Sequence, residues 1–437
     1  MQRYDSYKPS GIYFLSEFPS GWKIRKGKYL FKEENRPVHP GDEIVTCFRD
    51  GQVTLRKNRR VEGFTNSLKE IGYQGVRKGD LVIHNMDAFA GAIGISDSDG
   101  KATPVYSCCT PQSAEISQYY YCYLLRYLAR NGFILSLAKG IRERSTDFRF
   151  NDFKELYLPV PSRAEQDAIV SYLDTATAKI DSAIAQQQKM IDLLNERKQI
   201  IINNAVTKGL NPNAKMKDSG VEWIGEIPEG WECRKLKSIC ANTQYSIKTG
   251  PFGSQLKGDD IQEFGDVPIY NQRVVIDNDC CLFNSYVSKA KAVSLKSFVV
   301  NSKDLLITTR GTIGKSTIVP NDAPEGILHP CIIAIRLNFD LCFNEYLQFF
   351  FQSVAFNTDM MLKSNATTIE VIYSYNLKEC FVPLPPIDEQ KQIVEYLNEE
   401  LVRINQTIDA TTNQISLLQE RKQIIINEVV TGKVKVI

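Results

Sequence analysis

The chain has 437 residues, of which 43% are hydrophobic and 24% are charged. This composition is that of a folded globular protein and argues against disorder or a fibrous fold, and the length predicts two or three domains. The formal net charge is only +2, so overall charge gives no evidence for nucleic-acid binding.

The N-terminal segment lacks the basic run and the uninterrupted apolar stretch of a secretory signal, and no segment has about 18 consecutive apolar residues. We therefore expect a cytoplasmic protein that does not span a membrane. The 11 cysteines are odd in number and never show the C-x-x-C spacing of a zinc or redox site. This pattern favours buried, reduced thiols.

Two segments of the chain are copies of each other in a single, constant register. LPVPSRAEQDAIVSYL, which begins at Leu158, aligns without gaps with VPLPPIDEQKQIVEYL, which begins at Val382. The match continues until LLNERKQIIINNAVT, from Leu193, aligns with LLQERKQIIINEVVT, from Leu417. A match of this length indicates an internal duplication.

Each copy is predicted to form one long helix. Prolines precede it and a Glu-Gln pair lies in its first turn, as is typical of a helix start. Apolar residues then recur with the spacing of a coiled-coil seam. The first seam contains Leu173, Ile180, Ile184, Ile191, Leu194 and Ile201, and the second contains Leu397, Leu401, Ile404, Ile408, Ile415, Leu418 and Ile425.

Each helix would have about 40 residues and a length of roughly 60 Å. The polar seam residues Gln187, Thr411, Lys198 and Lys422 are of the kind that fixes the register or the partner of a coiled coil. We expect the two helices to pair with each other. Separate pairing of each helix with another chain is the alternative.

A second match, in a different register, shows that the segments preceding the two helices begin alike. SGIYFLSEFPSGWKIRK aligns with SGVEWIGEIPEGWECRK, which pairs Trp22 with Trp231. Because the registers of the two matches differ, the second segment is the longer one between its two anchors. The two segments therefore share a beginning but differ inside.

Only a weak similarity remains within these segments. Residues 78–83 match residues 302–307, and Gly94 is matched with Gly314. Apolar runs bounded by Gly, Asn and Asp predict strands and turns in both places.

These features predict a mixed α/β (α+β) fold with a pseudo-twofold internal repeat. Two globular domains, residues 1–157 and 211–381, are each followed by a helical spacer, residues 158–210 and 382–437. The first domain carries 24 Lys and Arg against 18 Asp and Glu, and the second carries 17 against 19. If either domain binds nucleic acid, its basic residues must be concentrated on one face.

The sequence has no recognisable catalytic motif. The G-K-S run at Gly314 resembles the end of a phosphate-binding loop, but Thr309 stands where that motif needs glycine. No G-x-G-x-x-G follows a predicted strand. The three histidines have no metal-ligand spacing, so we expect them in turns or in the core; they are His39, His84 and His329. We predict that the chain is not catalytic by itself and binds no metal.

The whole chain resembles the specificity subunit of a type I restriction-modification enzyme. The resemblance rests on the duplicated L/V-P-x-P…EQ…I-V-x-Y-L helix starts, the E-R-K-Q-I-I-I-N helix ends at Glu196 and Glu420, and the P-x-G-W motifs at Pro19 and Pro228. The turn G-P-F-G-S at Gly250 is also similar to one near the start of such domains.

The resemblance implies two target-recognition domains, residues 1–157 and 211–381, held apart by helices that pack as an antiparallel coiled coil. Members of this family bind double-stranded DNA, two methyltransferase subunits and two restriction and motor subunits, in an endonuclease and adenine methyltransferase complex. S-adenosylmethionine, ATP and Mg would then bind the partner subunits. We accordingly expect no cofactor on this chain.

The helix length suggests what the spacer does. B-DNA advances about 3.4 Å per base pair, so a helix of roughly 60 Å corresponds to fewer than about twenty base pairs. The helix pair would therefore act as a ruler between two half-sites. Because the two domains differ internally, we expect the half-sites to differ and the target to be bipartite and asymmetric.

Base edges are read by Arg, Lys, Asn and Gln, and phosphates are held by Arg and Lys. In the first domain we predict DNA contacts from the basic segments 56–60 and 140–144, although solvated surface explains the former equally well. In the second we predict them from polar residues beside Gly-rich turns, where ordinary turn chemistry is the alternative. The predicted DNA-binding residues are Arg56, Lys57, Arg59, Arg60, Arg142, Arg144, Ser254, Gln255, Lys257, Tyr270, Asn271, Arg273, Arg310 and Lys315.

Two equivalent partner subunits would need two equivalent docking surfaces, and both helices carry the same E-R-K-Q stretch. We predict that the outer faces of the helices dock the methyltransferase, whereas intramolecular packing is the alternative. The predicted docking residues are Glu196, Arg197, Lys198, Glu420, Arg421 and Lys422.

Two other functions also fit the sequence. The chain would serve equally well in a methylation-only or phage-defence system. A function of a different class is that of a two-headed scaffold, whose domains bind proteins or sugars.

Overall fold

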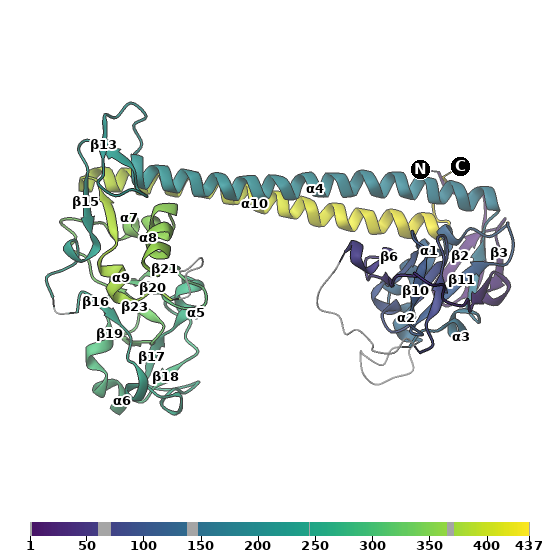
Figure 1. Cartoon of the computed structure of the whole chain (residues 1–437), viewed down its shortest axis with the longest axis horizontal. Helices are drawn as coiled ribbons and strands as arrows, with labels where there is room; N and C mark the ends of the chain where they lie inside the picture. Colours follow the sequence, from purple (N-terminus) through teal and green to yellow (C-terminus); the bar gives the residue numbers. More distant parts are fainter. Residues whose placement is uncertain (1, 60–70, 138–146, 244, 365–370, 437) are drawn as a thin grey trace. The chain divides into compact units, whose positions relative to one another are not determined.

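The computed structural model describes residues 2–59, 71–137, 147–243, 245–364 and 371–436. Contacts divide the chain into unit 1, Met1–Gln188 with Asn413–Ile437, and unit 2, Lys189–Thr412. The division falls inside the long helices α4 (Arg163–Lys208) and α10 (Ile387–Val430), so each unit has a globular part and a piece of each helix (Figure 1). The four segments predicted from the sequence divide the chain at the helix ends instead, and that division stays a prediction.

A four-stranded antiparallel sheet forms the centre of unit 1. In spatial order its strands are β4 (Phe31–Glu34), β11 (Tyr106–Pro111), β8 (Leu81–His84) and β9 (Ile93–Ile95). The apolar run predicted as a strand is β8, and its residues Leu81, Val82 and Ile83 are fully buried. Helix α1 (Gln118–Arg130) contacts β8 and β9 and packs its apolar face into the same core.

The other elements of unit 1 are short. They are the strand pairs β1 (Tyr7–Ile12) with β2 (Leu15–Pro19), β3 (Lys23–Lys26) with β12 (Tyr157–Val160), β5 (Val45–Cys47) with β6 (Val53–Leu55) and β7 (Gln74–Val76) with β10 (Gly100–Ala102), and the helices α2 (Phe133–Ser136) and α3 (Phe150–Phe153).

Unit 2 has a corresponding central sheet and a second one. The central sheet orders β16 (Ile247–Thr249), β23 (Ile332–Ile335), β20 (Leu305–Thr308) and β21 (Ser316–Ile318). The second orders β18 (Tyr286–Val287), β17 (Val267–Tyr270), β22 (Gly326–Leu328) and β19 (Val299–Val300), with β17 and β22 parallel. The other elements are β13 (Met216–Asp218) with β14 (Glu226–Pro228), β15 (Glu232–Lys235) with β24 (Phe381–Leu384), α5 (Gln272–Ile276), α6 (Lys289–Ser294), α7 (Asn344–Phe350), α8 (Val354–Ser364) and α9 (Ser374–Lys378).

The two central sheets share one strand order, because β4, β11, β8 and β9 correspond to β16, β23, β20 and β21. This confirms the mixed fold and the internal repeat. The predicted match of Gly94 with Gly314 is wrong. Gly94 pairs with Val82 in the sheet, whereas Thr317 pairs with Leu306, the residue that corresponds to Val82. The turn before β21 is shorter than the turn before β9, which shifts the alignment.

The two long helices pack against each other in each unit. Ile169 and Leu173 of α4 share the core of unit 1 with Val429 and Val430 near the end of α10. In unit 2 it is the end of α4 that shares a core with the beginning of α10. Early residues of one helix therefore face late residues of the other, so the helices are antiparallel (Figure 1). Of the predicted seam residues, those that are buried rather than half-buried are Leu173, Leu397, Leu401, Ile404 and Ile425.

One polar contact between the helices occurs in both units. In unit 1 the Lys422 ammonium lies 2.6 Å from the Asp181 carboxylate. In unit 2 Lys198 donates a hydrogen bond to the Asn405 side chain at 3.1 Å. The alignment of the two helix copies matches Lys198 with Lys422 and Asp181 with Asn405, so these are two versions of one contact. Both lysines therefore serve the register of the pair, as the polar seam predicts.

The Glu-Gln pair at each helix start anchors the helix to its globular part. The Trp22 indole N–H donates to the Glu165 carboxylate at 2.9 Å, and the Trp231 indole donates to Glu389 at the same distance. Both indoles are buried. The P-x-G-W and Glu-Gln motifs of each copy thus meet in one hydrogen bond.

The glutamine of each pair is fully buried and cross-links three segments. Gln166 accepts the Ser117 backbone N–H at 2.8 Å and donates to the carbonyls of Glu115 and Pro161. Gln390 makes the same set of bonds to the backbone before α7 and at Pro385. The amide can supply both donor and acceptor, which a glutamate could not.

Candidate nucleic-acid interface

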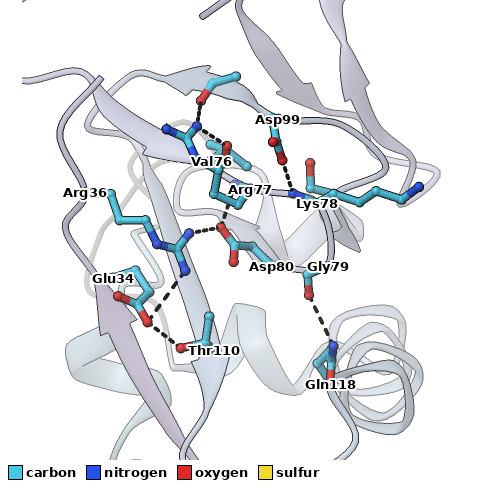
Figure 2. A network of polar contacts seen from close by, with 12 residues as sticks. Glu34, Arg36, Val76, Arg77, Lys78, Gly79, Asp80, Asp99, Thr110 and Gln118 are labelled. Carbon is cyan, nitrogen blue, oxygen red and sulfur yellow. Dashed lines mark hydrogen bonds and ion pairs between the residues drawn. The ribbon is translucent and has the colours of Figure 1, made fainter. Parts of the chain in front are cut away.

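A network of polar side chains fixes the turn that leads into β8 (Figure 2). The Asp80 carboxylate is 3% exposed and accepts hydrogen bonds from the Arg36 guanidinium and from the Arg77 backbone N–H. Gln118 of α1 donates to the carbonyl of Gly79, which has a φ of 93°. The buried charge is thus compensated, and the turn is held from two sides.

Unit 2 repeats this arrangement before β20. Asp304 is 2% exposed and accepts from the Arg336 guanidinium and from the Asn301 backbone N–H, both at 2.9 Å. Burial raises the pKa of the Asp304 carboxyl, while these bonds oppose the shift. Asn344 of α7 donates to the carbonyl of Lys303. Lys303 occupies the position of Gly79 in unit 1 and, like it, has a positive φ, of 65°. The central strand of each unit therefore begins at a rigid turn.

The predicted segments of unit 2 lie at the other end of this sheet. The Gly250 N–H, just after β16, donates to the Ile332 carbonyl, and a Cβ on Gly250 would lie 2.1 Å from the His329 carbonyl oxygen. The His329 N–H donates to the carbonyl of Tyr270 at the end of β17. Only glycine allows the first of these approaches. The segments after β16 and β17 are thereby held against the same connection.

The turn after β20 joins the same edge. The Gln272 side chain donates to the carbonyl of Arg310, and the Thr309 N–H donates to the Cys331 carbonyl at 3.0 Å. The predicted segments 270–273 and 310–315 therefore meet at one edge of unit 2, which we call the loop edge, and the chain that leads to the segment 254–257 leaves β16 at the same edge. The exposed predicted residues of these three segments are Ser254, Gln255, Lys257, Arg273, Arg310 and Lys315.

Asn271 has a structural role at the loop edge. Its side-chain oxygen accepts the Arg273 and Val274 N–H groups and caps α5. Its amide nitrogen donates to the side chains of Asn284 and Ser285. Contact with a base would require some of these bonds to break, so the amide positions the loop in this state.

The predicted DNA contact of Tyr270 is corrected. Its side chain is fully buried in a core of unit 2, and its hydroxyl donates to the Pro324 carbonyl at 2.6 Å. Burial raises the pKa of this hydroxyl. The residue ends β17 and points into the sheet packing, whereas the polar residues that follow it lie in the loop. No part of the ring is available to DNA.

Two basic side chains of the predicted segment 56–60 in unit 1 form ion pairs with acidic residues. Lys57 pairs with Glu43, and Arg59 pairs with Asp50 at 2.7 Å while covering the Phe48 ring at 4.2 Å. The Arg56 Nε donates to Thr46. Such exposed pairs contribute little energy, so phosphates can replace the acids at low cost. The predicted residues outside the described part of the chain are Arg60, Arg142 and Arg144.

The outer faces of the helices carry the predicted docking residues with one correction. The side chains of Glu196, Arg197, Glu420 and Arg421 are exposed. Lys198 and Lys422, by contrast, are engaged in the contact between the helices, so they do not belong to an outer face.

An apolar part of these faces was missed by the sequence analysis. Leu193 and Ile200 of α4 are 51% and 52% exposed, and the equivalent Leu417 and Ile424 of α10 are 64% and 46% exposed. Each pair flanks the exposed Glu-Arg of its helix. The available signal was that these apolar residues recur in both copies although they lie outside the seam. We call each set an outer face.

The G-K-S run does not form a phosphate cradle. The Lys315 backbone N–H donates to the Thr308 hydroxyl, and the Gly314 N–H donates to the Thr308 carbonyl. Both amides that a phosphate would need are therefore occupied.

His84 ends β8, His329 lies just before the turn that leads to β23, and His39 lies at a surface contact. The rings of His84 and His329 accept backbone N–H groups two or three residues later, and burial lowers both pKa values. The His39 ring lies 2.8 Å from Arg77. Among the described residues, no group of three or more His, Cys, Asp or Glu side chains is placed to hold a metal ion.

The cysteines agree with the expectation of buried thiols. All eleven are free, and only Cys281 is exposed. Burial raises the pKa of Cys108 and of Cys240 to about 12. Within the described part of the chain, no helix is long and apolar enough to cross a membrane.

Comparison with known proteins gives matches to one family. Residues 228–417 match the model of the type I restriction modification DNA specificity domain. The chain is 23% identical over 450 residues to a Methanocaldococcus jannaschii protein assigned as the specificity subunit of the type I restriction enzyme MjaX, with 97% of the chain and 96% of that protein covered. It is 28% identical over 265 residues to the specificity subunit of EcoBI from Escherichia coli, with 60% and 54% covered.

A solved structure shows the same fold. It comes from work on complex assembly and conformational transition of the type I R-M system, and superposes with a TM-score of 0.72 at 15% identity. The match covers 95% of this chain and 99% of that one. These comparisons agree with the resemblance seen in the sequence and do not favour a protein- or sugar-binding scaffold.

Proposed function

We infer that this chain, which belongs to the specificity subunits of type I restriction-modification enzymes, selects the DNA sequence on which such a complex acts. The observation that carries the inference is the match of residues 228–417 to the DNA specificity domain. That range contains the loop edge, where exposed polar side chains from two separate segments, 270–273 and 310–315, stand on a rigid sheet. Loops held by a rigid scaffold are the usual place for a recognition surface.

The repeat supports a bipartite, asymmetric target. Both units have the same central sheet and the same buried aspartate turn, but their exposed loop residues differ. Equivalent frames would present the loops at the corresponding edge of each sheet to DNA in the same way, whereas different side chains would read different bases. We propose that each unit reads one half-site.

The outer faces support docking of two methyltransferase subunits. Leu193 and Ile200 on α4 have the same spacing as Leu417 and Ile424 on α10, and each face includes a Glu-Arg pair. Exposed apolar residues with charged neighbours are characteristic of a protein interface. Two such faces on one chain suit two copies of one partner.

Catalysis is proposed to reside in the partner subunits. The methyltransferases would bind S-adenosylmethionine, and two restriction and motor subunits would bind ATP and Mg. In this chain, the one segment that resembles a phosphate loop has its amides engaged within the fold. A methylation-only or phage-defence complex would use the same two surfaces, and copurification of a motor subunit distinguishes these cases.

Methylation mapping tests the proposal. DNA is sequenced for modified bases from cells that contain the neighbouring methyltransferase with this chain, and from cells that lack this chain. We expect a chain-dependent motif of two short, different half-sites around a fixed gap. If the complex assembles but no new motif is modified, the scaffold function replaces the proposal.

A further inference from the structure

The turn that follows the central strand is built in the same way in both units. In unit 1 it is closed by a hydrogen bond from the His84 N–H to the Ala92 carbonyl, at 3.0 Å. In unit 2 the Thr308 N–H donates to the Lys315 carbonyl at 2.9 Å. His84 ends β8 and Thr308 ends β20, so the two turns have equivalent starting points. We call them the reading turns.

A second contact fixes the position of the next residues. The Phe148 N–H donates to the carbonyl of Asn85 at 3.0 Å, and the Ile372 N–H donates to the carbonyl of Thr309 at 2.9 Å. Both donors and both acceptors are matched by the register that aligns the two helix copies. The equivalence of the reading turns thus rests on the bond that closes each turn and on one matched backbone contact from a distant part of the chain, in addition to the strand order.

The residues that come next, Met86 and Arg310, therefore occupy equivalent positions. The Met86 side chain is 45% exposed, and Arg310 is exposed as well. The backbone of Arg310 is held by the Gln272 side chain and by a β-bridge to Val371. A held backbone with an exposed side chain is what a reading position requires.

The chemistry at this shared position differs between the units. Arginine presents a planar fork of donors that matches the O6 and N7 acceptors of guanine. Methionine has no strong donor and presents an apolar, flexible surface, which suits the methyl group of thymine. The surroundings differ too, because Met86 is followed by an Asp87 that pairs with Arg49 at 2.8 Å.

We propose that positions 86 and 310 are the equivalent base-reading positions of the two units, with Arg310 contacting a guanine of one half-site and Met86 contacting a thymine methyl group of the other. The proposal rests on the function inferred above. It goes further by naming the pair of residues that determines the difference between the half-sites. It also gives unit 1 a base-reading residue that lies outside the basic segment 56–60.

The test uses the full complex and a library of targets randomised in both half-sites. Arg310→Met is expected to lower the preference for one guanine by about tenfold to a hundredfold, in a single half-site. Met86→Arg is expected to lower the preference for one thymine in the other half-site only. Arg234→Met is the control, because Arg234 is a surface residue of β15 that pairs with Glu232; its motif should equal that of the wild type.

Three outcomes would overturn the proposal while leaving the proposed function intact. The first is an unchanged motif in both variants, and the second is a change in the same half-site for both variants. The third is uniformly weaker modification of all sequences after Arg310→Met, because this result would indicate a phosphate contact. If Arg310→Met unfolds, Arg310→Lys, which keeps the charge but loses the fork, is judged by the same criteria. A wild-type chain that directs no motif would instead refute the proposed function itself.

Discussion

At the scale of single residues, the two units each bury one aspartate, but they pair it with arginines from different strands. Asp80 and Asp304 are buried at the same place and both are paired with arginine. Arg36, however, follows β4, whereas Arg336 follows β23. A buried carboxylate needs compensation, but the arginine can come from any strand within reach. The aspartates could be matched from the sequence, and their partners could not.

The glycine in this turn gives a direct test of the local conformation. Gly79 has a φ of 93°, and a Cβ there would approach only the Gln118 side chain, at 4.0 Å. Gly79→Ala is therefore expected to lower the free energy of unfolding by about 1–2 kcal/mol through backbone strain alone. Chemical denaturation of the purified chain measures this change.

Gly21 supplies the matched control for that substitution. It also lies in a turn with open space around it, but its φ is not positive. Gly21→Ala should be neutral or should stabilise the chain by up to about 1 kcal/mol, because alanine restricts the unfolded state. Equal losses from both substitutions would show that the positive φ of Gly79 is not the cause.

Burial decides which of the candidate residues are accessible to a ligand. The loop residues after Gly250 and Arg310 were chosen as candidates because glycine and polar side chains mark a turn, and they are exposed. Tyr270 belongs to the same polar stretch of sequence but ends a strand, so its ring faces the core. Met86 was not among the candidates, because a single methionine carries no sequence signal for DNA binding. Its position became visible only through the reading turn.

At the scale of elements, periodicity made the helices the most predictable part of the fold. The seam residues and the helix starts lie where the spacing placed them, and the helices are longer than expected, at 46 and 44 residues. The outer faces were not predictable in this way. A periodic pattern identifies the face that packs within the chain, whereas Leu193 and Ile200 lie off the seam and are exposed.

Substitution of the outer faces tests their role in docking. Leu193→Ser with Ile200→Ser, or Leu417→Ser with Ile424→Ser, removes the apolar side chains of one face. Each double variant is expected to lower methyltransferase affinity at that face at least about tenfold, because buried apolar anchors dominate interfaces. Native mass spectrometry should then show one bound methyltransferase in place of two, and none with all four substitutions.

The control for this experiment is Val402→Ser. Val402 is 54% exposed on α10, but its equivalent in α4 is Ala178, so it belongs to no duplicated face. It should leave binding unchanged. All variants should unfold at nearly the wild-type temperature, since their side chains are half exposed. Retention of two methyltransferases by the fourfold variant would rule out the outer faces as docking sites.

At the scale of the whole molecule, the two copies keep the same structural frame and differ in their loops. The shared parts are the central sheet, the aspartate turn and the Trp-Glu bond at each helix start. The parts that differ are the loops, including the extra residues of the second unit. Sequence comparison within the chain could recover the frame because packing restricts it. It could not identify which loop side chains are presented at the surface, because loop conformation decides this.

The long helices give the last prediction, which concerns the gap between half-sites. Insertion of one heptad after Gln188 and of another after Thr412 adds about 10 Å to each helix at the division between the units. Because both helices gain one heptad between the Asp181–Lys422 and Lys198–Asn405 contacts, each unit keeps its own pair. If the helices set the spacing of the two reading units, the unread gap should widen by about three base pairs. Methylation mapping with a library of gap lengths measures this directly. An unchanged gap would refute the hypothesis that the helices act as a ruler. Insertion into α4 alone serves as the control, because it breaks the register of the helix pair and should abolish modification at every gap length.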